Sequence, residues 1–456
     1  MRPSAGRVHF IGIGGVGMSA IAKVLIERGV EVSGSDLKRS RPMAVLEAMG
    51  ARVTLGHDAA AVNGAGIVVA SSAIPPGNPE LVRAQELGIE IISRGQALAA
   101  LLSEARSIIV AGSHGKTTTT SMITSVLLSA GLDPTYLIGG GLNDSGTNAR
   151  SGRGDLAVAE SDESDGSFLL LDPHVAVVTN IERDHMDYWE SLDALRDAFV
   201  SFIERTDEDG CVIVPATDDF LTGTALRSSR RVVSFGDGGD VRATGVTATA
   251  QGVEFVIHDD RASENVRLRV PGLHNVTNAL AAAAACHGVD VPLDEIARGL
   301  DLYRGVERRF QVRGTASGVT VVDDYAHHPT EVRATLAAAR PGPWRRVVAV
   351  FQPHRYSRTR ILSDDFGDSF DDADRVVVTD VYGAGELPVP GVTGKLVSDA
   401  VCRRLPGRPV AYLPHRAELL AYLQASARAG DVLLTLGAGD ISSVGEELLA
   451  RLERSA

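Results

Sequence analysis

The stretch from Ile108 to Thr120 constrains this chain more than any other. An apolar run typical of a buried strand leads into Gly112-Ser-His-Gly-Lys-Thr117, and helix-like apolar spacing follows. Such a turn leaves backbone N–H groups at a helix N-terminus, where they and the helix dipole bind phosphate. We therefore expect a nucleotide site in which Lys116 reaches the outer phosphates and Thr117 ligates Mg²⁺. The loop is shorter than the general P-loop, because Val110 stands where its first glycine would fall. A plain strand-to-helix connection is the alternative.

A second glycine-rich turn, Gly12-Ile-Gly-Gly-Val-Gly17, lies near the N-terminus. It follows a strand-like run, and Asp36 ends the next predicted strand about 20 residues further on, as in dinucleotide folds. This pattern indicates a backbone built for a diphosphate, which fits NAD and a nucleotide sugar equally well. Ser71 and Ser72 follow a later strand, at the edge where open α/β sheets bind ligands, or they only form a turn.

The composition limits the classes of partner. A net charge of −13 argues against a nucleic-acid binder. The 3 cysteines are scattered and form no C-x-x-C pair, which favours a reducing compartment over a disulfide framework or a zinc site. No apolar run reaches the length of about 18 residues that a membrane span needs, and we see no secretory signal. We expect a cytoplasmic protein without membrane insertion, either a monomer or a homodimer.

Polar residues follow two predicted strands in the middle of the chain. Glu160 closes the strand-like run 156–160, where a P-loop site needs a hard oxygen ligand for Mg²⁺. The acids at Asp162, Glu163 and Asp165 fit a solvated turn as well as a site. His185 follows the next predicted strand by a few residues, and the dense polar run around it favours a metal or phosphate role over a structural one.

The pattern changes between residues 241 and 270 to short alternating strands, which indicates an antiparallel hairpin insertion. Asn275 and Asn278 come next and share one face at the start of an alanine-rich helix, which is predicted over residues 279–285. They fit helix capping, which is the simpler interpretation for Asn275, or contacts to an adenine edge or a reacting group.

Four strand-like runs in the last third are each followed by polar residues, at the binding edge of a parallel sheet. These residues include Asp324, His327, Arg355 and Arg358. The two arginines could clamp a carboxylate or phosphate, or they form surface salt bridges.

A chain of 456 residues predicts about three domains. Joints near Ala105 and Gly305 divide it into residues 1–105, 106–305 and 306–456, and strand–helix alternation in each makes it an α/β protein. An NAD-dependent oxidoreductase would use the first glycine turn and leave the second idle. A nucleotide-gated binding protein would use both turns but not the polar clusters at so many strand ends.

A series of motifs, in order along the whole chain, resembles the Mur ligases of peptidoglycan synthesis. They are His9-Phe-Ile-Gly-Ile-Gly-Gly-Val-Gly-Met-Ser19, Ala111-Gly-Ser-His-Gly-Lys-Thr-Thr-Thr119, Glu160-Ser-Asp-Glu-Ser-Asp165, Asn180-Ile-Glu-Arg-Asp-His-Met-Asp187, His274-Asn-Val-Thr-Asn278, Arg308-Arg-Phe-Gln311, Asp323-Asp-Tyr-Ala-His-His-Pro329 and Gln352-Pro-His-Arg-Tyr356. Ser113 replaces the threonine usual at its position, which keeps the hydroxyl.

The resemblance implies ATP-dependent ligation of L-alanine to the lactyl carboxylate of UDP-N-acetylmuramate through an acyl phosphate. It implies a Rossmann-like UDP-sugar domain, a central P-loop ATPase domain with the hairpin insertion, and a Rossmann-like C-terminal domain for the amino acid. A related ligase that recycles murein tripeptide shares the later motifs, but its N-terminal glycine motif looks different from this one; it is the alternative.

The resemblance also implies roles for individual residues. ATP would be bound by Gly112, Ser113, His114, Gly115, Lys116, Thr117 and Thr118. The UDP-sugar would be bound by Gly12, Gly14, Gly15, Gly17, Met18, Ser19, Asp36, Ser71 and Ser72. One Mg²⁺ would lie on Thr117 and Glu160 and a second on His185. Asn275 and Asn278 would lie by the reacting centre, Arg309 and Asp324 would reach ATP, and His327, Arg355 and Arg358 would hold the alanine and the substrate carboxylate.

Overall fold

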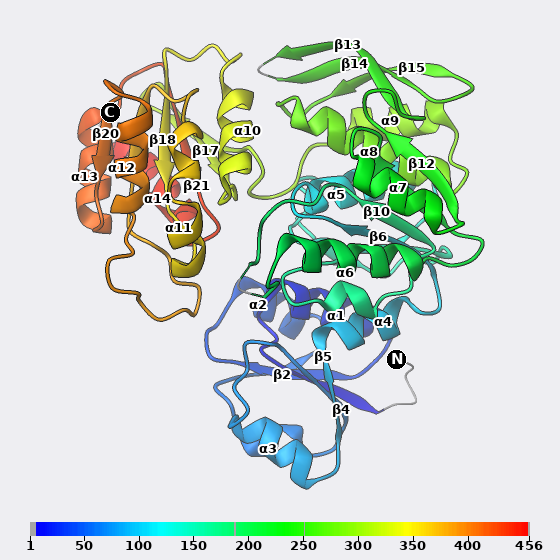
Figure 1. Ribbon diagram of the computed structural model, residues 1–456. Helices are drawn as coiled ribbons and strands as arrows, with labels where there is room; N and C mark the ends of the chain where they lie inside the picture. The colour runs from blue at the N-terminus through cyan, green and yellow to red at the C-terminus, as the bar shows by residue number, and fades with distance from the viewer. Residues whose placement is uncertain (1–5, 187, 250, 455–456) are drawn as a thin grey trace. The chain divides into compact units, whose positions relative to one another are not determined.

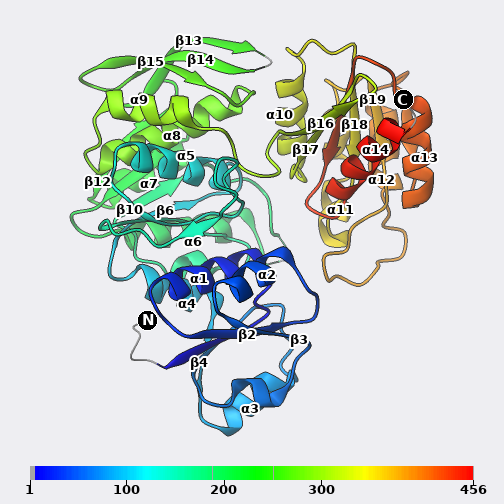
Figure 2. The same cartoon turned by 180° about the vertical axis from the view of Figure 1, so that it is seen from behind.

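A computed structural model describes residues 6–186, 188–249 and 251–454 (Figures 1 and 2). It contains two compact units. The first comprises Met1–Thr244, Ile257–Glu264 and Asn278–Leu302, and the second comprises Gly245–Val256, Asn265–Thr277 and Tyr303–Ala456. Within the described ranges, no helix is both long and apolar enough to cross a membrane.

The first unit begins with a five-stranded parallel sheet in the order β3-β2-β1-β4-β5. Its strands are β1 (Arg7–Ile11), β2 (Val32–Asp36), β3 (Arg52–Leu55), β4 (Ala65–Ala70) and β5 (Glu90–Ser93). Its helices are α1 (Val16–Glu27), α2 (Arg41–Ala48), α3 (Pro79–Glu86) and α4 (Arg94–Leu102). The strand order reverses between β1 and β4, and a Rossmann-like sheet binds its ligand at this reversal. The turns after β1 and β4 are the ones predicted to bind the diphosphate.

A second sheet of the same unit has seven strands in the order β12-β11-β10-β6-β9-β7-β8. They are β6 (Arg106–Ala111), β7 (Thr135–Leu137), β8 (Ala149–Arg150), β9 (Leu156–Glu160), β10 (Val175–Val178), β11 (Cys211–Pro215) and β12 (Arg231–Phe235). Every residue of β10 is buried, which is why this central parallel strand is wholly apolar. Because β6 lies between β9 and β10, the polar residues that follow these three strands meet at one edge.

Helices cover the central sheet and join it to the first one. They are α5 (Lys116–Ser129), α6 (Leu192–Glu204), α7 (Asp219–Arg227), α8 (His274–Gly288) and α9 (Leu293–Leu302). Helix α5 packs against α9, where Gly299 lets the two backbones approach. One apolar core includes Phe10 and Ile21 of the first sheet's layer and Phe168 and Phe199 of the central one. This shared core explains why the two sheets belong to one unit.

The insertion predicted between residues 241 and 270 is a separate three-stranded sheet, β13-β14-β15. It comprises β13 (Arg242–Thr249), β14 (Gly252–His258) and β15 (Ser263–Leu268). The division between the two units passes through this sheet and through α8.

The second unit is built on a six-stranded sheet in the order β16-β17-β21-β18-β19-β20. The strands are β16 (Gln311–Ala316), β17 (Val319–Asp324), β18 (Arg346–Phe351), β19 (Arg375–Val378), β20 (Val410–Tyr412) and β21 (Asp431–Leu436), with only the β16–β17 pair antiparallel among those described. Helices α10 (Pro329–Ala339) and α12 (Lys395–Arg404) pack in one apolar cluster, and α13 (Arg416–Ser426) and α14 (Ser442–Arg454) in another. A short helix, α11 (Tyr356–Leu362), follows β18. The sheet is thus covered on both faces, as a Rossmann-like fold requires.

Candidate functional site

The loop between β6 and α5 depends on two of its glycines. Gly112 has a φ of +131° and Gly115 a φ of +81°, which side chains rarely tolerate. A Cβ at Gly112 would overlap Thr179 Oγ1, and one at Gly115 would overlap Asn278 Oδ1. Gly115 is also the N-cap of α5, and since glycine has no capping side chain, the first N–H groups of the helix are available to an anion. Val110 still belongs to β6, so the loop needs no third glycine.

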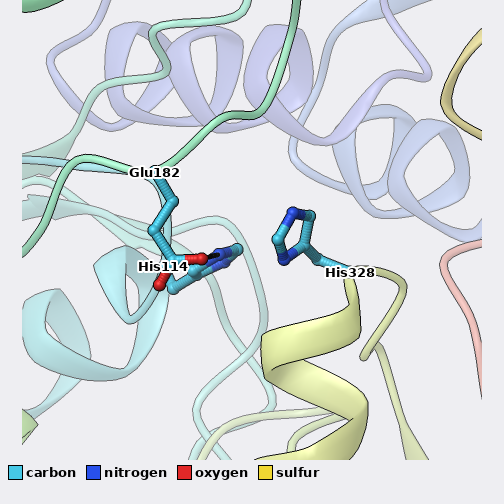
Figure 3. A group of neighbouring side chains, drawn as sticks. All are labelled: His114, Glu182 and His328. Carbon is cyan, nitrogen blue, oxygen red and sulfur yellow. Dashed lines mark ion pairs between the residues drawn. The ribbon is translucent and has the colours of Figure 1, made fainter. Parts of the chain in front are cut away.

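Polar contacts from the segment after β10 fix the shape of this loop. The backbone N–H of His114 donates to Asn180 Oδ1 at 2.9 Å, and Asn180 Nδ2 donates to the His114 carbonyl at 3.0 Å. The N–H of Glu182 donates to Ser113 Oγ at 2.8 Å, so the hydroxyl at this position accepts a hydrogen bond from the segment after β10. His114 Nε2 lies 3.4 Å from Glu182 Oε2 (Figure 3). These contacts within the protein therefore fix the shape of the loop.

Lys116 lies over the mouth of the loop among carboxylates. Its Nζ donates to the Gly112 carbonyl at 2.6 Å and to Glu163 Oε2 at 2.8 Å, and Asp162 Oδ1 is 3.7 Å away. Burial alone would lower the pKa of Lys116, but Glu163 and Asp162 outweigh burial and raise it above its usual value. The side chain is therefore a cation at neutral pH, as a phosphate ligand must be.

Glu160 and Thr117, predicted as one metal site, are brought together. The Thr117 hydroxyl and the backbone of Gly139 hydrogen-bond the Glu160 carboxylate, and burial is the main cause that raises its pKa. Glu160 Oε2 is buried and has no hydrogen-bond partner in the described part of the chain. A buried carboxylate oxygen without a donor, beside a hydroxyl, fits a hard divalent cation.

The acidic segment after β9 is only partly a solvated turn. Glu163 is fully buried, and burial raises the pKa of its carboxyl although Lys116 lies beside it. Ligand atoms of Asp162, Glu163 and His185 all lie within 4.8 Å of one another. His185 has a strained φ of +55°, and Asp184 Oδ2 lies 3.6 Å from its Nε2. Sequence reasoning could not choose between a turn and a site for Glu163, because its burial follows from how the segments after β9 and β10 approach each other.

The first glycine turn is tied to its own sheet. The N–H of Gly14 donates to Asp36 Oδ2 at 2.9 Å, and the N–H of Ser71 donates to the Ile11 carbonyl at 3.2 Å. Gly12 has a φ of +84°, and its missing Cβ leaves room for Ser71. These contacts join the turns after β1 and β4 at the reversal of strand order.

The remaining predicted UDP-sugar residues differ in exposure. Gly15 is the N-cap of α1, and Ser72 is exposed in its turn. Met18 and Ser19 are buried within α1, where the Ser19 hydroxyl donates to the Val16 carbonyl. The N–H groups of residues 12–15 already donate within the protein, so the backbone donors left for a ligand are those at the start of α1.

Arg94 joins the first turn to the central sheet's acidic segment. A Cβ at Gly17 would lie 3.2 Å from Arg94 Cδ and Nη1, so the arginine lies directly against this glycine. Arg94 Nη2 donates to Asp165 Oδ2 at 3.1 Å and to Ser167 Oγ at 3.3 Å. Asp165 is thus held away from Lys116 by another partner.

The two asparagines lie in the first turn of α8, one turn earlier than the helix predicted over 279–285. Asn275 is inside the helix, and its Nδ2 donates to the Pro271 carbonyl at 2.7 Å, which is not the contact of a helix cap. Asn278 lies against Gly115 of the nucleotide loop.

In the second unit Asp324 is buried at the end of β17. Its carboxylate accepts hydrogen bonds from the N–H groups of Phe310 and Ala326 at 2.7 and 2.8 Å. Burial raises the pKa of Asp324 to about 6, against the opposing effect of Arg309. The Arg309 guanidinium lies 5.3 Å from the centre of the Tyr325 ring.

A histidine and arginine cluster follows β17 and β18 in the same unit. The rings of His327 and His354 are 5.7 Å apart, and Arg358 Nη1 lies 3.3 Å from His354 Nδ1. Arg358 is buried, which excludes a surface salt bridge, and Arg355 has a φ of +67° at the start of α11. His354, which stacks on Tyr382 at 5.8 Å, was not predicted as a site residue.

Models of one protein family match most of the chain. They are described as Mur ligase family, catalytic domain (residues 7–106), Mur ligase middle domain (residues 110–286) and Mur ligase, glutamate ligase domain (residues 308–439).

Relatives that are 46–49% identical over nearly the whole chain are named UDP-N-acetylmuramate–L-alanine ligase. UDP-N-acetylmuramate–L-alanine ligase of Rubrobacter xylanophilus is 49% identical over 449 residues, covering 98% of this chain and 100% of that protein. The crystal structure of UDP-N-acetylmuramate–alanine ligase from Thermotoga maritima has a TM-score of 0.84 at 30% identity, covering 99% and 100% of the two chains. A murein peptide ligase from Psychrobacter arcticus has a TM-score of 0.74 at 25% identity and covers 98% and 99%.

Proposed function

The chain belongs to the Mur ligase family, and on that premise we propose that it joins L-alanine to the lactyl carboxylate of UDP-N-acetylmuramate at the expense of ATP. The observation that carries this is the 49% identity, over almost the whole of both chains, to a relative named for the reaction. The TM-score of 0.84 to a ligase of this kind exceeds the 0.74 to a murein peptide ligase, which favours alanine over a peptide as the acceptor. The reaction supplies a precursor of peptidoglycan.

The chemistry requires activation, because a carboxylate does not react with an amine at neutral pH. Transfer of the γ-phosphoryl group of ATP to the lactyl carboxylate forms an acyl phosphate and ADP. The amine of L-alanine then attacks the acyl carbon, and the tetrahedral intermediate expels phosphate.

The loop between β6 and α5 would hold the ATP phosphates through residues 112–118, with Lys116 neutralising charge on the transferred group. Thr117 and Glu160 would hold one Mg²⁺ and His185 a second, and the unpaired Glu160 oxygen supports the first assignment. Bound there, Mg²⁺ would offset the phosphate charge and orient the reacting oxygens.

The remaining predicted residues are assigned to the UDP-sugar, to ATP and to the amino acid. The turn after β1, residues 12–17, would bind the UDP diphosphate beside Asp36 and Ser71. The first N–H groups of α1 would be the donors, because those of residues 12–15 already donate within the protein. Arg309 and Asp324 would reach ATP, and His327, Arg355 and Arg358 would hold the alanine and the substrate carboxylate, with Asn275 and Asn278 at the reacting centre. This gives residues 1–105 to the UDP-sugar, 106–305 to ATP and 306–456 to the amino acid. The 3 cysteines are free, which supports a reducing compartment such as the cytoplasm.

The test is phosphate release from ATP with Mg²⁺ and UDP-N-acetylmuramate, with and without L-alanine. We expect release only with both substrates, and a loss of at least about 100-fold in Lys116→Ala, because the charge on the phosphoryl group is no longer offset. Lys395→Ala is the control, since that lysine pairs with Asp399 on the exposed face of α12. Release that depends on the murein tripeptide instead of alanine would identify a recycling ligase, and no release with either acceptor would refute the proposal.

A further inference from the structure

The two oxygens of the Glu163 carboxylate have different surroundings. Oε2 accepts a hydrogen bond from Lys116 Nζ at 2.8 Å. Oε1 is buried, 3.9 Å from His185 Nε2, and has no hydrogen-bond partner among the residues that the structure describes. A fully buried oxygen of this kind requires a partner, so one side of this carboxylate is prepared for a group that binds later.

The charges around Lys116 do not balance once a nucleotide is bound. Its ammonium lies 2.8 Å from Glu163 Oε2 and 3.7 Å from Asp162 Oδ1, so a single cation serves two carboxylates. When Lys116 turns to a phosphate, Glu163 is left buried without its countercharge, which is strongly unfavourable. The triphosphate adds further negative charge at the same place. Either a proton or a second cation must therefore neutralise the carboxylate that Lys116 leaves, and the neighbouring ligand atoms favour the cation.

The neighbours of Glu163 indicate where that cation would bind. Ligand atoms of Asp162, Glu163 and His185 lie within 4.8 Å of one another, and carboxylates with an imidazole suit Mg²⁺ or Mn²⁺. The backbone of this segment is fixed, because Trp189 Nε1 donates to the Glu163 carbonyl at 3.0 Å.

We propose that Glu163 exchanges partners when the nucleotide binds, giving up Lys116 and taking a divalent cation that it shares with Asp162 and His185. This rests on the proposed function only in requiring a nucleoside triphosphate in the loop between β6 and α5. Glu163 is thus a positioning residue: it keeps Lys116 from the phosphates until the cation is present. The loop then binds the metal–nucleotide complex in preference to the metal-free nucleotide.

The test compares the wild type with Glu163→Gln, which removes the charge and keeps the shape. Binding of a non-hydrolysable imido analogue of ATP is measured by calorimetry, with Mn²⁺ and with a chelator, and bound Mn²⁺ is counted by electron paramagnetic resonance. In chelator we expect Glu163→Gln to bind the analogue about tenfold more tightly than the wild type. Lys116 is then free to contact the phosphates, and the negative charge of Glu163, which repels them, is removed. With Mn²⁺ we expect it to bind about tenfold more weakly and to hold one ion fewer.

Two further variants separate the parts of the proposal. Asp165→Asn lies in the same acidic segment, but its carboxylate contacts Arg94, so both affinities should match the wild type. His185→Asn should lose the same Mn²⁺ ion and leave binding in chelator unchanged. If Glu163→Gln unfolds early, Glu163→Asp takes its place: it keeps the charge, so binding in chelator should stay weak while the Mn²⁺ ion is lost.

Weaker binding of the analogue by the same factor with and without Mn²⁺ would overturn the proposal, because Glu163 would then only support Lys116. An unchanged Mn²⁺ count in Glu163→Gln would overturn it as well. Neither measurement uses UDP-N-acetylmuramate or alanine, so an error in the substrate assignment would appear separately, as missing alanine-dependent phosphate release.

Discussion

The two glycine-rich turns of the first unit have similar backbones and different side chains. Each joins a strand to a helix, β1 to α1 and β6 to α5, and each helix has a glycine as its N-cap. The first turn of α1 is apolar or small, and the N–H of Gly14 is already engaged by Asp36. The first turn of α5 carries Lys116 and three hydroxyls beside buried carboxylates.

This difference teaches that the glycine pattern identifies an anion site but not its chemistry. Backbone N–H groups alone suffice to bind a diphosphate that does not react. Transfer of a phosphoryl group requires in addition a cation that can move and carboxylates that hold metal. The side chains around the turn, more than the turn itself, therefore separate a binding site from a reaction site.

The largest difference between the two turns should appear when one glycine in each is replaced by alanine. Gly115→Ala must adopt a φ of +81° and overlap Asn278, whereas Gly15→Ala would keep a φ of −67° with its nearest neighbour 3.6 Å away. Strain of about 1–3 kcal/mol and a displaced loop should lower ATP turnover at least about 100-fold in Gly115→Ala. Gly15→Ala should fold normally and retain ATP affinity. Melting curves and steady-state kinetics check this, and equal losses in both variants would contradict it.

Buried glutamates of the two sheets should respond to pH in opposite directions. Burial alone would raise the pKa of Glu80 behind the first sheet, but hydrogen bonds from His9 and Ser35 outweigh it and lower the pKa. The pKa of Glu160 is raised, mainly by burial. Glu80 therefore stabilises the fold above its unfolded pKa and loses that effect as the pH falls. Glu160 costs stability as the pH rises above its unfolded pKa.

We accordingly expect Glu80→Gln to lower the free energy of unfolding more at about pH 7 than at about pH 4. For Glu160→Gln, the free energy of unfolding relative to that of the wild type should increase from about pH 4 to about pH 7. Urea unfolding in the presence of a chelator measures both, so that no bound metal alters Glu160. Parallel pH profiles of the two variants would show that the sheets do not differ in this way.

The smallest expected effect concerns Asp36. Asp36→Asn keeps an oxygen that can accept from the N–H of Gly14 but loses the charge. The KM for UDP-N-acetylmuramate should rise about threefold, and the KM for ATP should not change. Steady-state kinetics with each substrate varied in turn separates the two, and a change in the KM for ATP would show that the turns are not independent.

The sequence allowed the strands and turns of both glycine motifs to be predicted, because alternation of apolar and small residues is local. The apolar, β-branched segment Ile108 to Ala111 was predicted as a strand, and it lies within β6. The start of α8 was predicted too late, since Asn275 is a weak helix former whose position depends on its contact with Pro271.

The contacts of the site were predictable where two residues follow neighbouring strands of one sheet, and not where loops pack against each other. The side chains of Thr117 and Glu160 lie together because β6 and β9 are neighbours in the sheet, and their binding of Mg²⁺ stays a prediction. The burial of Glu163 and the stacking of His354 on Tyr382 depend on long-range packing that no local pattern encodes. The assignment of residues 1–105, 106–305 and 306–456 to separate substrates stays a prediction.

The contact of Arg94 with Gly17 has an evolutionary consequence. A side chain at position 17 would press on Arg94, and the guanidinium of Arg94 also holds Asp165. Three positions that are distant in sequence thus form an epistatic set, in which a substitution at one changes what is tolerated at the others. A substitution at position 17 should therefore be tolerated best together with a change at Arg94 or Asp165.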